Sequence, residues 1–184
     1  MKKCLITFFI VVLFSSLFSN EGPYHYRIVE IETEERQYAP FTHVYIVLDN
    51  GSRWFTDFHN HYARYFDGWQ EGDLVSLQHC FCGHYALTNL SHSQLLWHFT
   101  LDRSTQDVFP MVSSVEDNGY YLTLSDGSKW SIGYFNAGTA SEWRVGSSVV
   151  VHPENSTLRG TTHSIYNMDD ETYIYATFIA EYQQ

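Results

Sequence analysis

The sequence predicts an all-β protein built from two tandem small β-barrels. One observation is a duplicated hairpin signal: Asn50-Gly51 and Asp126-Gly127 each follow a run in which apolar residues alternate with other residues. Asn, Asp and Gly tolerate the positive φ that a two-residue hairpin turn needs. The other observation is the close, even spacing of short strand-like segments, which is typical of small barrels and curled sheets. SH3-like and OB-like geometries both remain open at this stage.

Residues 1–19 are predicted to form a cleaved signal peptide. Lys2 and Lys3 supply a short positive region, the apolar run that follows is too short to span a bilayer, and Ser19 offers a small residue for cleavage. An uncleaved anchor is the alternative. The segment predicts a bacterial protein that is secreted or periplasmic, with no membrane span in the mature form.

The first barrel is predicted to occupy residues 20–102. Val44, Ile46 and Leu48 recur with a period of two, so they share one strand face, and Trp54 is expected to point to the same buried face. Aromatic residues spaced by three or four positions between 58 and 69 predict a short helical turn over a barrel end. Strands are expected at residues 24–34, 43–49, 52–58, 74–79, 85–89 and 95–101.

A polar linker is predicted at residues 103–107 and the second barrel at 108–184. Asp117-Asn118-Gly119 predicts a turn, and a loop containing Gly and Ser is expected before Trp143. The mature chain is long enough to be one domain, but the duplicated pattern favours two. Strands are expected at residues 109–115, 120–124, 128–134, 148–152, 161–167 and 173–181.

Three blocks of the two barrels match in the same order along the chain: residues 48–54 with 124–130, 69–75 with 143–149, and 87–97 with 165–175. The pattern D-G-S-x-W followed by W-x-x-G-D-x-V resembles an uncharacterised bacterial secreted β-repeat module. The resemblance covers nearly all of the mature chain. Its shared residues are turn and core positions, so it implies a fold and no activity. The second copy departs from it at Ser147, where the first has Asp73.

The charge of the chain narrows the classes of partner. The chain carries 10 Lys and Arg against 21 Asp and Glu, a formal charge of −11. Loss of Lys2 and Lys3 with the signal peptide would leave −13. Binding to a phosphate backbone needs a cationic footprint, so a nucleic-acid partner is excluded. An unknown protein or cell-envelope ligand is the expected partner.

The most specific local cluster is His79, Cys80, Cys82 and His84. Thiolate and imidazole together suit zinc or copper, although paired zinc cysteines are usually separated by two residues or more. A local Cys80–Cys82 disulfide is the favoured alternative in an oxidising compartment, and free thiols are the third. Eight of the ten histidines lie between residues 25 and 98, so the first barrel holds most of these groups. No cofactor is expected beyond this possible zinc or copper ion.

No catalytic motif is present, since the chain lacks a G-x-S-x-G elbow, an H-E-x-x-H helix and a Gly-rich phosphate loop. The sequence therefore favours a non-catalytic binding protein, with a metal-binding envelope protein as the alternative. The expected contacts are residues of the first barrel that differ from the second. These candidate partner-binding residues are Phe55, His59, His61, Tyr62, Tyr65 and Phe66.

Overall fold

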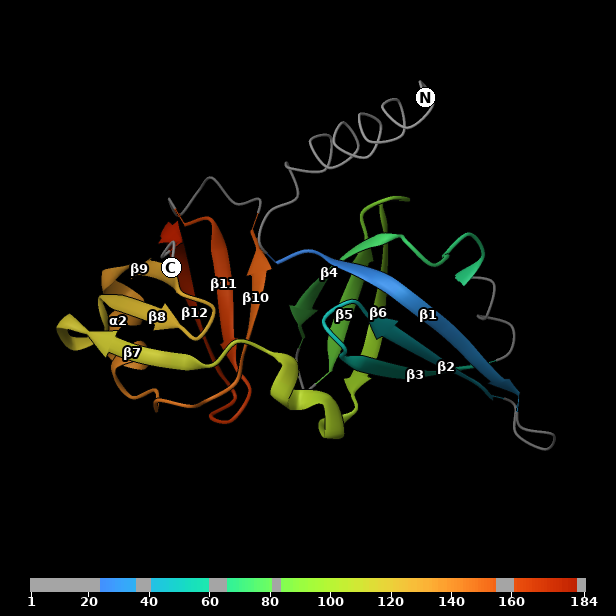
Figure 1. Ribbon diagram of the computed structural model, residues 1–184, viewed down its shortest axis with the longest axis horizontal. Helices are drawn as coiled ribbons and strands as arrows, with labels where there is room; N and C mark the ends of the chain where they lie inside the picture. Colours follow the sequence, from blue (N-terminus) through green and yellow to red (C-terminus); the bar gives the residue numbers. More distant parts are fainter. Residues whose placement is uncertain (1–23, 36–40, 60–65, 81–83, 155–160, 182–184) are drawn as a thin grey trace, which may run out of the picture.

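The computed structural model describes residues 24–35, 41–59, 66–80, 84–154 and 161–181, so the predicted signal peptide lies outside the described residues. The fold is all-β, as predicted, and forms two units that lie side by side (Figure 1). Strands β4 (Leu74–His79) and β10 (Val149–Pro153) flank the junction between the units. Within the described residues, no helix has the length and apolar character needed to cross a membrane.

The first unit is a closed barrel with the strand order β1-β2-β3-β6-β5-β4. Three hairpin-connected strands are followed by a connection that returns β4 to the side of β1, which is a Greek-key arrangement. The barrel closes through a short pairing of Tyr26 and Arg27 with Val75 and Leu74. Its strands besides β4 are β1 (Tyr26–Glu35), β2 (Phe41–Leu48), β3 (Arg53–His59), β5 (Tyr85–Asn89) and β6 (Gln94–Leu101).

The second unit is a six-stranded sheet with the corresponding order β7-β8-β9-β12-β11-β10. Among the described residues its outer strands form no continuous ladder with each other: at their ends Met111 bridges Ser148, and the backbone N–H of Gly146 donates to the carbonyl of Val112. The sheet is therefore curled but is not closed as the predicted second barrel would be. Its strands besides β10 are β7 (Val112–Glu116), β8 (Tyr121–Leu124), β9 (Ser128–Ile132), β11 (His163–Asn167) and β12 (Thr172–Glu181).

Two short helical elements replace expected loops. The predicted linker forms the 3-10 helix η3 (Arg103–Val108), and the Asp102 side chain caps it by accepting from the backbone N–H of Ser104. The expected loop before Trp143 contains the helix α2 (Tyr134–Ser141). This helix docks on the 3-10 turn η4 (Asp117–Gly119), where a Cβ on Gly119 would lie 1.9 Å from a backbone oxygen of Ala137. Glycine therefore permits the close approach of helix and turn.

The two hairpin turns are built by the same contacts. Gly51 and Gly127 both have φ of +85°, and each donates its backbone N–H to the leucine that ends the preceding strand. A turn side chain, Asn50 in the first unit, accepts from the backbone N–H of a buried serine. That serine in turn accepts 2.8 Å hydrogen bonds from the indole N–H of the buried tryptophan two residues later. The turn therefore orients the tryptophan at the centre of each core.

Each unit contains a buried asparagine that donates to an aspartate, but the aspartate comes from a different turn in each unit. In the first unit, Asp73 accepts from the side-chain amide of buried Asn89 at 2.7 Å. In the second unit Ser147 stands in place of the aspartate, and Asn167 donates instead to Asp170 at 3.1 Å. Both asparagines are fully buried, so each needs this acceptor. The accepting carboxylate therefore occupies a different sequence position in each unit, but the buried asparagine amide donates to an aspartate in both.

Aromatic residues couple the cores of the two units. Tyr24, which precedes β1, packs 5.5 Å from Trp130 of the second unit, and its hydroxyl lies 2.8 Å from Ser128 Oγ. Phe109, which precedes β7, packs edge-on against Trp54 of the first unit at 6.0 Å. Each unit therefore receives an aromatic ring from the segment that leads into the other.

Candidate functional site

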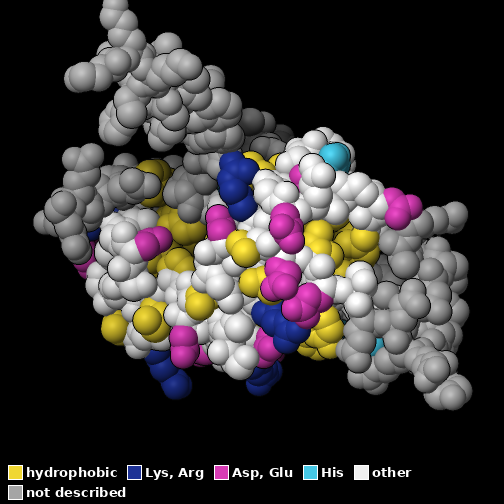
Figure 2. All heavy atoms as spheres, turned by 45° about the vertical axis from the view of Figure 1, so that its right-hand side comes forward, with side chains coloured by type: hydrophobic (Ala, Val, Ile, Leu, Met, Phe, Trp, Pro, Cys, Tyr) yellow, Lys and Arg dark blue, Asp and Glu magenta, His cyan; other side chains and the backbone are white. Residues whose placement is uncertain are grey.

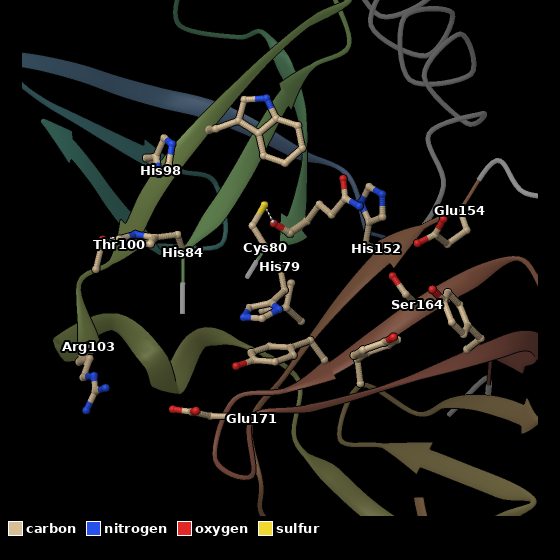
Figure 3. Close-up of a pocket in the computed structure, with 16 residues that line it drawn as sticks. His79, Cys80, His84, His98, Thr100, Arg103, His152, Glu154, Ser164 and Glu171 are labelled. Atoms are coloured by element: carbon tan, nitrogen blue, oxygen red, sulfur yellow. Dashed lines mark hydrogen bonds between the residues drawn. The ribbon is translucent and has the colours of Figure 1, made fainter. Parts of the chain in front are cut away.

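A cleft of about 1200 Å³ lies between the two units and is the main candidate site (Figure 3). Cys80, His84 and His98 reach it from the first unit, and His152 and Ser164 reach it from the second. Strands β4 and β10 contact each other, and both contribute side chains to the lining of the cleft. Its full lining is Gln78, His79, Cys80, His84, Trp97, His98, Thr100, Arg103, Val150, His152, Glu154, Ser164, Tyr166, Glu171, Tyr173 and Tyr175.

Strand alternation places aromatic rings on the walls of the cleft. In β6 the side chain of Leu96 is buried and that of Trp97 is 49% exposed. In β12 Ile174 is buried, so Tyr173 and Tyr175 on either side of it face the cleft. Opposite sides of a strand carry alternate residues, so burial of the apolar core residues presents these rings outward. Trp97 is the most exposed tryptophan in the chain.

The junction at one side of the cleft is an inter-unit ring stack. His79 of β4 lies face to face with Tyr166 of β11, with ring centroids 3.5 Å apart and planes 8° apart. Tyr85 packs edge-on against the same two rings. The contact joins the units through planar side chains.

The charged groups of the cleft are mainly acidic. Glu154 and Glu171 come from the second unit, and Arg103 comes from η3 (Figure 3). An adjoining hollow of about 310 Å³ shares Arg103 and Glu171 with the cleft and adds Asp169. Within the part of the chain that the structure describes, the linings of the two spaces therefore contain three carboxylates and one guanidinium. On the face shown in Figure 2, by contrast, acidic and basic side chains are interspersed.

Burial disfavours the charged form of two histidines at the junction. Burial lowers the pKa of His79 and of His152, and in each case a nearby glutamate opposes the effect. His79 Nε2 and His152 Nδ1 are buried with no hydrogen-bond partner among the described residues. A proton on either nitrogen would therefore create a buried N–H without an acceptor there, which is costly. The neutral form is the one that suits this environment.

Three members of the predicted His/Cys cluster meet at the cleft. His79, Cys80 and His84 all line it, and the backbone N–H of Cys80 donates to the carbonyl of His84 at 2.7 Å. Cys82 lies outside the described residues, so the predicted disulfide and the complete metal ligand set are untested. Burial raises the pKa of the Cys80 thiol, which favours the thiol over the reactive thiolate. Within the described residues, no group of three or more His, Cys, Asp or Glu side chains could hold a metal ion.

The predicted partner-binding residues lie elsewhere or outside the described residues. Phe55 is half-buried on the first unit beside the ring of Tyr45, away from the cleft lining. Phe66 packs edge-on against Trp69 and Phe99 and contributes to the first core. His59 ends β3, and its side chain is not described. His61, Tyr62 and Tyr65 lie outside the described residues.

Sequence reasoning missed the aromatic and acidic walls of the cleft. Trp97 and Tyr175 occupy matching positions in the last strand of each unit, one residue after a buried Leu96 or Ile174. That alternation was a usable signal, because an outward aromatic at the same place in both units is not needed for either core. The position of Glu171 carried no comparable signal, since only the tertiary arrangement brings its turn to the cleft.

The comparisons with known proteins found no match among family models, curated proteins or solved structures.

Proposed function

We propose that this protein is a secreted or periplasmic, non-catalytic binding protein whose ligand occupies the cleft between two tandem β-repeats. The cleft is the observation that carries the proposal. It is large enough for a ligand of drug size or above, and it combines aromatic walls with a few polar groups, as binding sites generally do. Its half-buried thiol has a raised pKa, so Cys80 does not favour a nucleophilic reaction.

The tandem-repeat part of the proposal is supported by the matching order of the strands and by the matching turns. The same serine–tryptophan hydrogen bond occurs after both hairpin turns, and both units keep a buried asparagine with an acidic partner. The Greek-key order of the first barrel favours the OB-like over the SH3-like alternative, with six strands in place of five. The signal peptide and the export it implies rest on the sequence of residues 1–19.

Cleft-blocking variants test this function. Ligand-observed NMR would screen a fragment mixture of amines, carboxylates and sugars against the wild type, Ser164→Trp and Thr100→Trp. The two substitutions place a bulky ring in the cleft from opposite walls. We expect fragments that bind the wild type and lose binding in both variants. Circular dichroism would verify that the variants fold. Fragments that bind all three proteins equally would place the ligand site outside the cleft.

A metal-binding envelope protein is the second candidate. It is favoured by the backbone hydrogen bond that brings Cys80 and His84 together beside His79 at the cleft. Metal analysis of the protein from residue 20 onward, with thiol titration of the same sample, tests it. Stoichiometric zinc or copper that is lost in Cys82→Ser would support this candidate. Protein without metal and without a titratable thiol would support the Cys80–Cys82 disulfide.

A further inference from the structure

The charge and the ring arrangement of the cleft restrict the chemistry of its ligand. Among the described residues that line them, the cleft and the hollow beside it carry the carboxylates of Glu154, Glu171 and Asp169 and the guanidinium of Arg103. The whole chain, these four groups included, carries a formal charge of −11. An anionic ligand would be repelled both by the carboxylates of the lining and by the net charge of the chain. A cationic ligand would be attracted to the protein by its net charge and bound in the cleft by those carboxylates.

Exposed aromatic faces strengthen the case for a cation. Trp97 is 49% exposed and Tyr173 is 59% exposed, so their rings remain available to a ligand. Lysine and arginine side chains bind such faces through cation–π contacts, with tryptophan the best partner. Carboxylates next to accessible rings therefore match a guanidinium or ammonium group on a short aliphatic stem.

The extent of the site favours a chain over a single small amine. The cleft of about 1200 Å³ continues into the hollow of about 310 Å³ through shared lining residues, Thr100, Arg103, Tyr166 and Glu171. Glu154 and Glu171 lie in different parts of the lining, as Figure 3 shows. Several basic side chains on one extended segment could thus be bound at the same time.

We propose that the cleft binds a basic peptide segment of a partner protein, with lysine or arginine side chains against Trp97 and Tyr173 and between Glu154 and Glu171. This proposal rests on the proposed binding function and adds the class of ligand. The partner is defined by its exposed basic segment, and Ser164, Thr100 and Gln78 are the lining residues whose hydroxyl and amide groups would contact the peptide backbone.

Calorimetry with short capped peptides tests the proposal. The probes are lysine/glycine, arginine/glycine and glutamate/glycine peptides of equal length, and a neutral oligosaccharide. We expect both basic peptides to bind the wild type, and the glutamate peptide and the oligosaccharide to bind at least about tenfold more weakly. The double variant Glu154→Gln/Glu171→Gln removes two charges from the lining with little change in shape. It should weaken the basic peptides about tenfold.

A matched control distinguishes the effect of the cleft carboxylates from the effect of the overall negative charge of the protein. Glu30→Gln/Glu142→Gln removes the same number of charges from positions outside the cleft, and it should change the affinity about twofold or less. Trp97→Ala should weaken the basic peptides to a similar extent as the cleft double variant. Equal losses in the two double variants would overturn the proposal.

The binding results distinguish an error in the basic-peptide proposal from an error in the proposed binding function. Tighter binding of the oligosaccharide or the glutamate peptide, lost in Trp97→Ala, would overturn the basic-peptide assignment and retain the cleft as a ligand site. If none of the probes binds, and the cleft-blocking variants bind the same fragments as the wild type, both the basic-peptide proposal and the proposed binding function would be overturned.

Discussion

At the scale of single residues, the serine after each hairpin turn holds the indole of the central tryptophan. Ser52→Ala would leave the indole N–H of fully buried Trp54 without its 2.8 Å acceptor. An unsatisfied buried donor costs about 1–3 kcal/mol, so the free energy of unfolding should fall by that amount. Urea denaturation measures it, and Ser113→Ala on the exposed side of β7 is the control. A loss no larger than the control's would refute the role assigned to Ser52.

His163 is predicted to make the protein sensitive to acid. Burial, with further effects of His152 and His25, lowers the pKa of His163 to about 4. The unfolded chain therefore binds a proton near the ordinary histidine value of about 6.5, before the folded protein does. The contribution of His163 is complete above that value and is lost progressively as the pH falls towards 4. Because the ring is partly exposed, we expect a loss on the order of 1–2 kcal/mol.

The first unit supplies the substitution that tests this sensitivity. Tyr85 lies edge-on to Trp54 at 4.8 Å, and His163 lies edge-on to Trp130 at 4.9 Å. His163→Tyr should therefore fit while removing the titrating group. Thermal melts between about pH 4 and pH 7.5 should show a shallower decline for the variant than for the wild type. Parallel declines would assign the acid sensitivity to other groups.

At the scale of elements, the docking of α2 depends on the absence of a side chain at Gly119. Gly119 and Gly72 both have φ of +90°, but a Cβ on Gly119 would meet backbone atoms of Ala137 and Ser141 while Gly72 faces open space. Gly72→Ala should cost about 1 kcal/mol from backbone conformation alone. Gly119→Ala should cost at least about 3 kcal/mol, because the helix must also move. Denaturant unfolding of the two variants measures both costs, and the difference between them is the steric cost at Gly119. Equal costs would contradict the close contact between Gly119 and α2.

The sequence predicted most strands to within a few residues because turn chemistry and two-residue alternation are local signals. Asn50-Gly51 and Asp126-Gly127 both close hairpins, and Trp54 and Trp130 are buried as expected. The helix α2 was missed because Asn136, Gly138 and Thr139 are weak helix formers, and its stability depends on docking rather than on propensity. Tertiary packing of this kind leaves no local pattern.

The cleft could be predicted only in fragments. The sequence predicts His79, Cys80 and His84 as members of a His/Cys cluster on the basis of their residue types, and the structure places these three residues in the lining of the cleft. Its opposite wall comes from the second unit, where Ser164 and Glu171 carry no motif. Contacts between units far apart in the chain, such as the His79–Tyr166 stack, decide which residues face each other. Their pairing depends on how the two sheets pack, which alternation within a strand does not encode.

At the scale of the whole molecule, Tyr24 is predicted to stabilise the unit to which it does not belong. Its ring packs on Trp130, and its hydroxyl lies within hydrogen-bond distance of Asp126 and Ser128. Tyr24→Ala should cost about 3–5 kcal/mol through the cavity it leaves. Hydrogen exchange should then accelerate in β9 of the second unit. Val29→Ala, at an exposed position of β1, is the control and should leave exchange in β9 unchanged.

Ring contacts couple the two units that form the cleft, and contacts of this kind would help to preorganise the proposed binding site. Reciprocal insertion of Tyr24 and Phe109 and the His79–Tyr166 stack hold the walls together from different sides. The proposed binding function would therefore need both units, because each of them supplies residues to the lining of the cleft.

The indole N–H signals of the five tryptophans provide the most direct test of the claim that the cleft is the ligand site. Trp97 is about half exposed and lines the cleft, whereas Trp54, Trp69, Trp130 and Trp143 are buried and serve as internal references. Two-dimensional ¹H–¹⁵N NMR during titration with the lysine/glycine peptide should shift the Trp97 signal and leave the other four nearly unchanged. A saturating ligand that leaves the Trp97 signal in place, or that moves all five together, would contradict a ligand site in the cleft.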